Sequence, residues 1–437
     1  MAPVNVLLVS YNFPPVGGMG VQRALKLTKY LPRHGVNPVV LTNALSLGQL
    51  QDPALLNDID PSTVIHRVGG EKLGPLYAEK GQPFSRYFLG LTNLQNIIKN
   101  GEIHAVWFDS IVNKLQHLVE HHHIDCVLTT LPKHTSSLIG HHLKTTMGIP
   151  WIADLRDSVV GAPDRQPSIV DRLRSFGLLE IEKKIDKHAD CVVTVSEPIR
   201  DSFLSRHKNK RSNRFKVIEN GYDPEEFTNL AEKSQTNPKL TFTYAGSFWG
   251  ERKPDVLIRG FQIAAENNWI SRDAVKIQIA GAYGSETREK FARLGKTLEV
   301  VQFGAIERRS ALELLAQSDW LLLVTANTNR GTVSEVLTGK IFEHMALKKP
   351  TLALCPASGP LPELIENGNL GIATSASSAE TVASHIAKAY QNWISEKKSW
   401  RFNRDVTDQY DRKVQVERYA DLIHAVCRSC LKEKTEV

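Results

Sequence analysis

The 437-residue sequence has no long uncharged apolar run. A helix that spans a bilayer needs about 20 consecutive, mainly apolar residues, and no run of about 18 occurs. The start of the chain also lacks a basic segment followed by an apolar one, because residues 4–10 lead directly into a polar, proline-rich stretch. We therefore expect neither a membrane-spanning helix nor a secretory leader.

Cysteines are also few, and they are scattered: Cys126, Cys191, Cys355, Cys427 and Cys430. This usage does not suggest a disulfide framework and fits a reducing compartment such as the cytoplasm. Cys427 and Cys430 form a lone CxxC, which we expect to be two thiols on a terminal helix. Metal is not indicated either, because the DxD pair Asp58–Asp60 lies in a polar turn and His121–His123 lacks acidic or cysteine companions at ligand spacing.

The charge that is present is mainly positive, with a net charge of +7. Such an excess suits nucleic acid, an anionic membrane surface or an anionic small substrate. The densest basic run, Arg206–Lys216, has one aromatic residue, too few to stack the bases of a single strand, so no nucleic acid is expected. A solvated loop and attraction to anionic lipid both stay open for this run.

Short β-branched runs alternate with helix-period segments along the whole chain. Such alternation predicts βαβ units and doubly wound parallel sheets, whose buried strands are nearly continuously apolar. In the first half the predicted strands are Val4–Tyr11, Pro38–Thr42, Thr63–Val68, Asp125–Leu131, Trp151–Leu155, Cys191–Ser196 and Phe215–Glu219. In the second half they are Thr241–Gly246, Lys276–Gly281, Val300–Gly304, Trp320–Thr325 and Thr351–Cys355.

A polar, proline-bearing stretch interrupts the alternation at Asp223–Leu240 and is typical of a linker. We therefore expect an N-terminal domain over residues 1–228 and a C-terminal domain over 229–402. A terminal helix within 403–432 is expected to pack back on the first domain. The segment Gly70–Lys99 fits the alternation poorly and is either a packed helical insert or a surface for an acceptor or a membrane.

A glycine-rich loop, YNFPPVGGMGVQR (Tyr11–Arg23), directly follows the first predicted strand. Backbone N–H groups of glycines can approach an anion closely, and the following helix adds the positive end of its dipole. A dinucleotide fingerprint is disfavoured, because Gly18 and Gly20 fit its first two positions but Arg23 occupies the third. A phosphate-contacting loop and an ordinary loop without a ligand both remain open.

The second half offers a pair of glutamates, Glu335 and Glu343, which enclose seven residues (EVLTGKIFE). Lys340 lies between them, at the start of a predicted helix whose free N–H groups and nearby cation suit a phosphate. Ionised carboxylates accept hydrogen bonds from sugar or ribose hydroxyls. Taken alone, two glutamates near a helix start can also be solvated surface.

Together these stretches resemble a retaining glycosyltransferase of the GT-B fold, family four. The family has an E-x7-E stretch before a helix similar to FEYMALGKP, and here the helix reads FEHMALKKP. The matching stretches, in order, are PPVGGMGVQR (14–23), PWIADLRD (150–157), VIENGYDPEEF (217–227), YAGSFWGERK (244–253) and FEHMALKKP (342–350). The resemblance covers nearly the whole chain and implies two Rossmann-like, doubly wound parallel-sheet domains facing a cleft.

For the donor, the resemblance implies a nucleotide-diphosphate sugar held mainly by the second domain. Glu343 is expected to bind the ribose and Glu335 the transferred sugar. Gly17 and Gly18 are expected to cover the diphosphate from the first domain. The remaining donor-binding candidates form the phosphate-side turn and its cations: Ser247, Arg252, Lys253 and Lys340.

The family's lysine a few residues beyond the arginine is replaced by Leu257 here. Lys253 and Lys340 both stay candidates for the second phosphate cation.

For catalysis, the resemblance implies transfer with retention, without a metal or another cofactor. His134 follows the fourth strand, near where the family places a residue beside the reacting sugar; the alternative is a loop histidine. Asp157 is a candidate partner of the acceptor hydroxyl, or forms an ion pair with Arg156. Arg23 assists the donor or the acceptor, or pairs with an acid. Positioning and stabilisation of the leaving diphosphate are expected to dominate catalysis.

The expected activity is sugar transfer to a glycan or lipid-linked acceptor, as in bacterial surface-polysaccharide synthesis. A cytoplasmic protein is expected, with attachment to the inner face of the cell membrane as an open alternative. A nucleotide-sugar 2-epimerase of the same fold is the alternative enzyme, and a non-catalytic binder with a decayed site is the third hypothesis.

Overall fold

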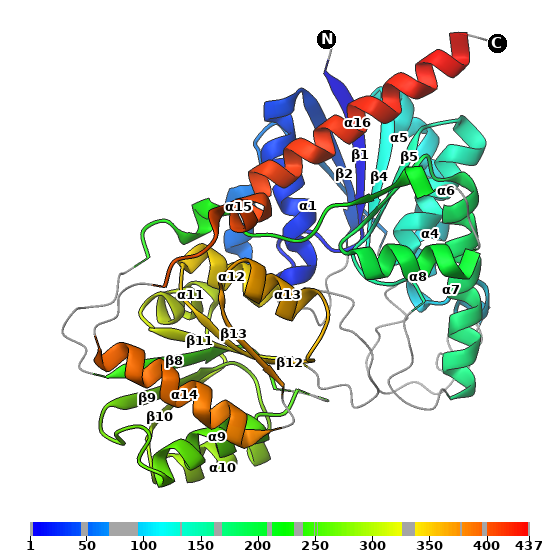
Figure 1. The fold of residues 1–437 in the computed structure, drawn as a ribbon. Helices are drawn as coiled ribbons and strands as arrows, with labels where there is room; N and C mark the ends of the chain where they lie inside the picture. Colours follow the sequence, from blue (N-terminus) through cyan, green and yellow to red (C-terminus); the bar gives the residue numbers. More distant parts are fainter. Residues whose placement is uncertain are drawn as a thin grey trace. The chain divides into compact units, whose positions relative to one another are not determined.

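The computed structural model describes most of the chain, in the ranges 3–44, 51–69, 95–131, 133–160, 168–207, 212–230, 239–248, 250, 252–325, 337–375, 378–395 and 400–435. It divides into two compact units (Figure 1). The first comprises Met1–Glu219 with Lys413–Val437, and the second Asn220–Arg412. Glu335 and most of the segment 70–99, namely 70–94, lie outside the described residues.

The first unit is built on a seven-stranded sheet in the order β3-β2-β1-β4-β5-β6-β7, with every ladder parallel. The first strand therefore lies inside the sheet, between the second and the fourth. The strands are β1 (Val4–Ser10), β2 (Val36–Asn43), β3 (Val64–Val68), β4 (Cys126–Thr130), β5 (Trp151–Leu155), β6 (Cys191–Thr194) and β7 (Phe215–Val217).

Helices connect these parallel strands, as crossovers between parallel neighbours require. The α-helices are α1 (Met19–Tyr30), α4 (Val106–Ile111), α5 (Leu115–His121), α6 (Thr135–Met147), α7 (Ile169–His188), α8 (Glu197–His207) and α16 (Arg412–Thr435). The 3-10 turns are η1 (Leu31–His34), η2 (Pro53–Asp58), η3 (Ile103–Ala105), η4 (Val112–Lys114) and η5 (Ser212–Arg214).

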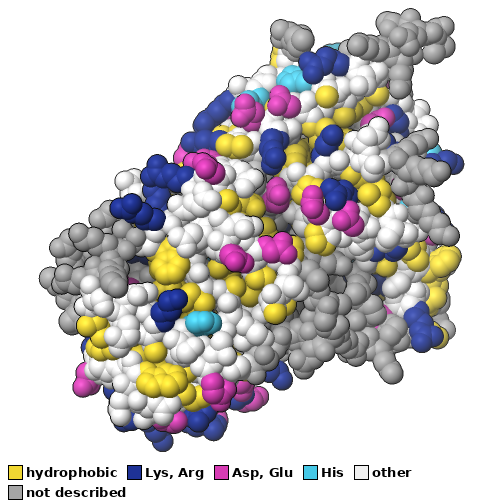
Figure 2. Space-filling model, in the orientation of Figure 1, with side chains coloured by type: hydrophobic (Ala, Val, Ile, Leu, Met, Phe, Trp, Pro, Cys, Tyr) yellow, Lys and Arg dark blue, Asp and Glu magenta, His cyan; other side chains and the backbone are white. Residues whose placement is uncertain are grey.

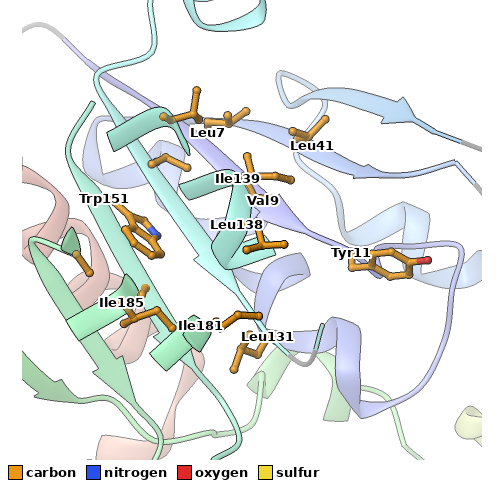
Figure 3. Packing of buried hydrophobic residues seen from close by; sticks show 14 of the residues in the cluster. Leu7, Val9, Tyr11, Leu41, Leu131, Leu138, Ile139, Trp151, Ile181 and Ile185 are labelled. Atoms are coloured by element: carbon orange, nitrogen blue, oxygen red, sulfur yellow. The ribbon is translucent and has the colours of Figure 1, made fainter. Parts of the chain in front are cut away.

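The core on one side of this sheet contains Trp151, which is fully buried among Ile181, Ile185 and Leu138 (Figure 3). Its Nε1 donates to the hydroxyl of Thr129 at 2.9 Å. A Cβ placed at Gly140 of α6 would lie 2.2 Å from that nitrogen, so α6 packs on β5 only because residue 140 is glycine. Apolar runs in the strands thus give a close-packed layer.

The long C-terminal helix α16 packs on the other side of the same sheet, beside α1 (Figure 1). Its buried residues Val416, Tyr419 and Ile423 join a cluster with Leu8 of β1 and Leu128 of β4. The terminal thiols of Cys427 and Cys430 lie on this helix, and neither forms a disulfide bond with the part of the chain that the structure describes.

A buried polar network fastens α16 to the rest of the unit. The guanidinium of Arg23 forms an ion pair with Asp154 at 2.8 Å and donates to the carbonyls of Ile218 and Glu219, both at 2.7 Å. The hydroxyl of Tyr419 donates to Asp154 at 2.9 Å and accepts from Arg23. Arg23 is 1% and Asp154 0% exposed, so each buried charge depends on these partners.

The second unit has a six-stranded parallel sheet in the order β10-β9-β8-β11-β12-β13. Its strands are β8 (Leu240–Ala245), β9 (Val275–Ala280), β10 (Glu299–Gly304), β11 (Trp320–Val324), β12 (Thr351–Cys355) and β13 (Gly371–Ser375). The α-helices are α9 (Asp255–Glu266), α10 (Ser285–Leu294), α11 (Arg308–Ala316), α12 (Gly339–Leu347), α13 (Pro360–Asn367), α14 (Ala379–Ile394) and α15 (Arg404–Thr407). Two 3-10 turns, η6 (Pro224–Phe227) and η7 (Asp408–Tyr410), also belong to it.

The expected fold class of two doubly wound parallel-sheet units is confirmed. Each predicted strand is present, with ends that differ by at most two residues. The sequence missed β13 (Gly371–Ser375), an edge strand that is only partly buried and starts at a glycine with a φ of +145°. The chain passes between the units at Glu219 and Asn220, before the linker-like stretch.

Replacing Tyr419 by Phe is expected to lower the free energy of unfolding by about 1–3 kcal/mol, because two buried charges each lose a hydrogen bond. Denaturant unfolding of both proteins measures this difference. Tyr390→Phe on α14 is the control, since no hydrogen bond of that hydroxyl occurs within the described residues, and it should change stability little. Equal stability of Tyr419→Phe and the parent protein would contradict the assignment.

Candidate functional site

The two sheets have the same kind of topological switch point. The second and fourth strands flank the first, so the connections leaving the first and fourth strands diverge to opposite faces of the sheet. This occurs between β1 and β4 in one unit and between β8 and β11 in the other. Open α/β sheets bind ligands at the carboxyl ends of strands at such points.

In the second unit a bare turn follows β8. Gly246 has a φ of +150°, and its N–H donates to the carbonyl of Ala280 at 2.8 Å. A Cβ at Gly281 would lie 1.9 Å from the carbonyl oxygen of Gly246. The backbones of the two turns therefore touch, and this close approach requires a glycine at position 281.

The ammonium of Lys340 is held directly over this turn. Its Nζ donates to the hydroxyl of Tyr244 at 3.0 Å and lies 4.4 Å from the centroid of that ring. A Cβ at Gly246 would lie 2.1 Å from Nζ, so residue 246 leaves the space that the ammonium fills. Tyr244 in turn donates to the carbonyl of Ser247 at 3.1 Å, which fixes the ring between the turn and the lysine.

The Lys340 ammonium is electrostatically unfavourable where it lies. Burial lowers its pKa to about 8, repulsion from Arg252 acts in the same direction, and Glu343 opposes them. Lys253, the other candidate cation, is exposed. The like charges of Lys340 and Arg252 repel each other at the end of β8, and a bound anion would stabilise both of them.

Glu343 lies on α12, three residues after Lys340. Its Oε1 accepts from Nη1 of Arg308 at 2.7 Å, and Nη2 of Arg308 donates to Oε2 of Glu226 at 2.7 Å. The structure thus brings Ser247, Arg252, Lys340 and Glu343 to one end of the sheet. Arg308 was missed by the sequence analysis, although an arginine as the first residue of a helix is an unusual choice.

Other residues of the FEHMALKKP stretch are structural. His344 is fully buried and its Nδ1 lies 2.9 Å from the hydroxyl of Thr351. Burial, with a contribution from Lys340, lowers the pKa of His344 to about 3, so its imidazole is neutral. Lys348 follows the last residue of α12 with a φ of +54°, at the position where the similar stretch FEYMALGKP has glycine.

In the first unit, the glycine loop is held by an arginine. Gly18 has a φ of +89° and precedes α1. The guanidinium of Arg156 donates to the carbonyls of Met19 at 3.1 Å and Leu131 at 3.3 Å, and also to that of Gly20. Arg156 therefore ties the start of α1 to the end of β4.

Of the three roles left open for Arg23, the structure shows the pairing with an acid, Asp154. Asp157 is exposed, and Arg156 bonds backbone carbonyls rather than that carboxylate. Arg156 is also buried, and the sequence analysis gave it no role of its own.

His134 precedes α6 and is 8% exposed. Its Nδ1 is buried and makes no hydrogen bond to the described residues, while burial lowers its pKa. Glu102, another residue that the sequence analysis missed, accepts from the N–H of Thr135 at 2.5 Å and holds the start of α6. A neutral imidazole with an unsatisfied nitrogen is a potential donor or acceptor for a ligand.

The acidic pair Asp58–Asp60 is bonded to protein groups. Asp58 accepts from Lys29 at 3.2 Å and also from Lys26, both on α1. Asp60 accepts from the N–H of Ser62 at 2.9 Å. The contacts of Asp58 fasten η2 to α1.

Comparison with known proteins gives one family model that matches part of the chain. The family model described as "Glycosyl transferases group 1" matches residues 239–392, nearly the whole second sheet and its helices. A search of curated proteins gave no match.

Three solved structures are similar along the whole chain. HepE from Anabaena, in complex with UDP and glucose, has a TM-score of 0.58 at 14% identity, over 99% of this chain and 100% of that one. WaaG, described as a glycosyltransferase involved in lipopolysaccharide biosynthesis, has a TM-score of 0.60 at 15% identity, over 96% and 99%. The lipopolysaccharide outer core galactosyltransferase WaaB has a TM-score of 0.58 at 14% identity, over 97% and 99%. At such identities these likenesses establish the fold.

Lys348→Gly is expected to raise the free energy of unfolding by about 1 kcal/mol, because glycine takes the left-handed conformation without the cost of a Cβ. Thermal melting of the purified protein measures the change. Lys348→Ala is the matched control: it removes the same side chain but keeps the Cβ, and it should give no gain. A gain of the same size for alanine would show that the charge, and not the backbone conformation, destabilises this helix end.

Proposed function

We propose that this group 1 glycosyltransferase of the GT-B fold moves a sugar from a nucleotide-diphosphate sugar to a glycan or lipid-linked acceptor, with retention and without a metal. The single observation that carries the proposal is the half-buried Lys340 ammonium, held over the Gly246 turn with Arg252 nearby. The alternative of a non-catalytic binder gains no support from a site in which these cations are intact.

The chemistry explains why cations belong there. Sugar transfer builds negative charge on the departing diphosphate, and fixed positive charges stabilise that charge in the transition state. Lys340 lies in the first turn of α12, where no side chain caps the helix start, so N–H groups of the helix add to the site. Lys340, Arg252 and the start of α12 would together hold the leaving group.

The remaining residues receive proposed roles. Glu343 accepts from the ribose hydroxyls, and Glu335, outside the described residues, from the transferred sugar. Gly17 and Gly18 contact the diphosphate from the first unit. We assign His134 to the reacting sugar because its buried nitrogen has no hydrogen-bond partner within the described residues. We assign Asp157 to the acceptor hydroxyl because its carboxylate is exposed and its charge acts on His134.

A UDP-sugar is the first donor to test, since HepE was solved with UDP and glucose. A bacterial surface-polysaccharide acceptor is suggested by the similarity to WaaG and WaaB. No helix among the described residues is long and apolar enough to cross a membrane. On the face that Figure 2 shows, basic and acidic side chains are interspersed, so contact with anionic lipid stays a proposal, as does action in the cytoplasm.

A thermal-shift screen of nucleoside diphosphates and their sugars tests the donor class. A ligand at about 100 times its Kd should stabilise the protein by about 2.7 kcal/mol. Lys340→Gln should abolish the shift, whereas Lys348→Gln, a lysine at the other end of the same helix, should preserve it. The proposal fails if the folded protein responds to no sugar nucleotide at millimolar concentration.

Product analysis separates transfer from isomerisation. With a donor and acceptor glycan, the sugar should appear on the acceptor with its anomeric configuration retained. A changed sugar in the absence of any acceptor would instead identify a nucleotide-sugar 2-epimerase.

The affinity for a nucleoside diphosphate should fall as pH rises above about 8. The free Lys340 has a pKa of about 8, and a bound phosphate favours the ammonium and raises that pKa, so binding above pH 8 must take up a proton. The Kd should rise by up to about tenfold per pH unit between pH 8 and 9.5. Lys340→Arg, which stays charged, should bind with a flat profile over this range; a falling profile in this variant would assign the effect to another group.

A further inference from the structure

We propose that Arg308 is a positioning residue for donor recognition: it holds the carboxylate of Glu343 toward the ribose hydroxyls and away from the Lys340 ammonium. This inference rests on the proposed function, in which Glu343 accepts from the ribose and Lys340 contacts the diphosphate. Arg308 itself need touch neither the sugar nor the nucleotide.

The geometry gives Arg308 two fixed contacts. Nη1 donates to Oε1 of Glu343 and Nη2 to Oε2 of Glu226, each at 2.7 Å. The two carboxylates are 15% and 16% exposed, so water screens these pairs only in part. A guanidinium is a rigid planar fork, and its two ends therefore set the direction of the Glu343 carboxylate relative to Glu226.

One oxygen of Glu343 remains available. Its Oε2 makes no hydrogen bond to the residues that the structure describes, whereas Oε1 is occupied by Arg308. A carboxylate oxygen can accept from a hydroxyl, and one that is already oriented binds it without losing rotamer freedom. A carboxylate with one oxygen held by Arg308 and the other able to accept a hydrogen bond suits a ribose hydroxyl.

The placement of Arg308 breaks a local rule of helix formation. It is the first residue of α11, and the first turn of this helix has no acidic residue. A cation at this end interacts unfavourably with the helix dipole. Residues that break such a rule are expected at functional sites, and here the two carboxylates compensate the cation.

Glu226 anchors Arg308 from the segment that opens the second unit. Glu226 lies in η6, whose start is fixed by Asp223 accepting from the N–H of Glu225 at 3.1 Å. Phe227 and Leu230, just beyond, pack against the apolar cluster that includes Leu312 and Leu315 of α11. The segment and the helix that bears Arg308 thus support each other.

Glu343 interacts with two cations, Arg308 and Lys340. Lys340 is its other electrostatic neighbour, and Glu343 acts to raise the pKa of that lysine. Without Arg308, the carboxylate would be attracted to the Lys340 ammonium, one helical turn away. It would then leave the ribose site and neutralise the phosphate site in the same movement.

The test compares Arg308→Gln with Arg309→Gln, a matched control. Arg309 is the next residue of α11 and pairs with Glu313 at 3.0 Å, so its removal takes the same charge from the same helix end. The probes are UDP, GDP, ADP and CDP, each paired with its 2′-deoxy form. Binding is measured by calorimetry between pH 7.5 and 9.5, and folding by circular dichroism.

The parent protein and Arg309→Gln should prefer the ribonucleotide by about tenfold or more, as a hydrogen bond to a charged group implies. Arg308→Gln should reduce this preference to about threefold or less. It should also move the loss of affinity to a pH above that of the parent, because Glu343 would raise the pKa of Lys340. The preference of Glu226→Gln for the ribonucleotide should lie between those of the parent protein and Arg308→Gln.

Several outcomes would overturn the inference. They are an unchanged preference in Arg308→Gln, a tighter binding of the ribonucleotide by that variant, or a parent protein that binds nucleoside diphosphates without preferring ribose. If Arg308→Gln does not fold, Arg308→Lys decides, since it keeps the charge but loses the fork and should still reduce the preference. A parent protein that binds no nucleoside diphosphate at all would instead refute the proposed function.

Discussion

The contact between the Lys340 ammonium and the Gly246 turn is the constraint on which the second unit's site depends. Within the described residues this ammonium donates to a phenol hydroxyl and not to a carboxylate. Glu343, the acid that acts on the pKa of Lys340, is bonded to Arg308 instead. Even a half-buried cation without a bonded acid is unfavourable, and an anionic ligand that supplies the missing charge is bound more tightly for that reason.

The first unit has the same kind of topological switch point, but its buried arginines bond the backbone. Within the described residues, Arg23 and Arg156 are the buried arginines of this unit, and both bond backbone carbonyls. Arg23 fastens the end of β7 and the helix α16, and Arg156 fastens the start of α1. Phe13 and Val16 of the glycine loop pack into apolar clusters, and the bonds of Arg156 add to this by fixing the start of the helix that follows. The loop's bare backbone and its rigid attachment together suit the close approach of a diphosphate.

Much of the fold could be predicted from the sequence because parallel strands covered on both faces are nearly continuous apolar runs. VNVLLVS and WLLLV are such runs, and both are strands. GIATS was missed because β13 is an edge strand with a glycine and polar residues, and its identity depends on pairing with β12. Local patterns do not contain that information.

For the site, the sequence by itself determined the kinds of group available: a glycine turn, lysine and arginine cations, and a glutamate one turn along a helix. Tertiary structure alone decided which of them act together. It placed Lys340 in a half-buried position and left Lys253 exposed, paired Arg23 with Asp154, and set Arg308 between Glu226 and Glu343. Arg23 and Asp154, like Arg308 and Glu226, are far apart in the sequence. Only folding brings such charges within a few ångströms and excludes the water that would screen them.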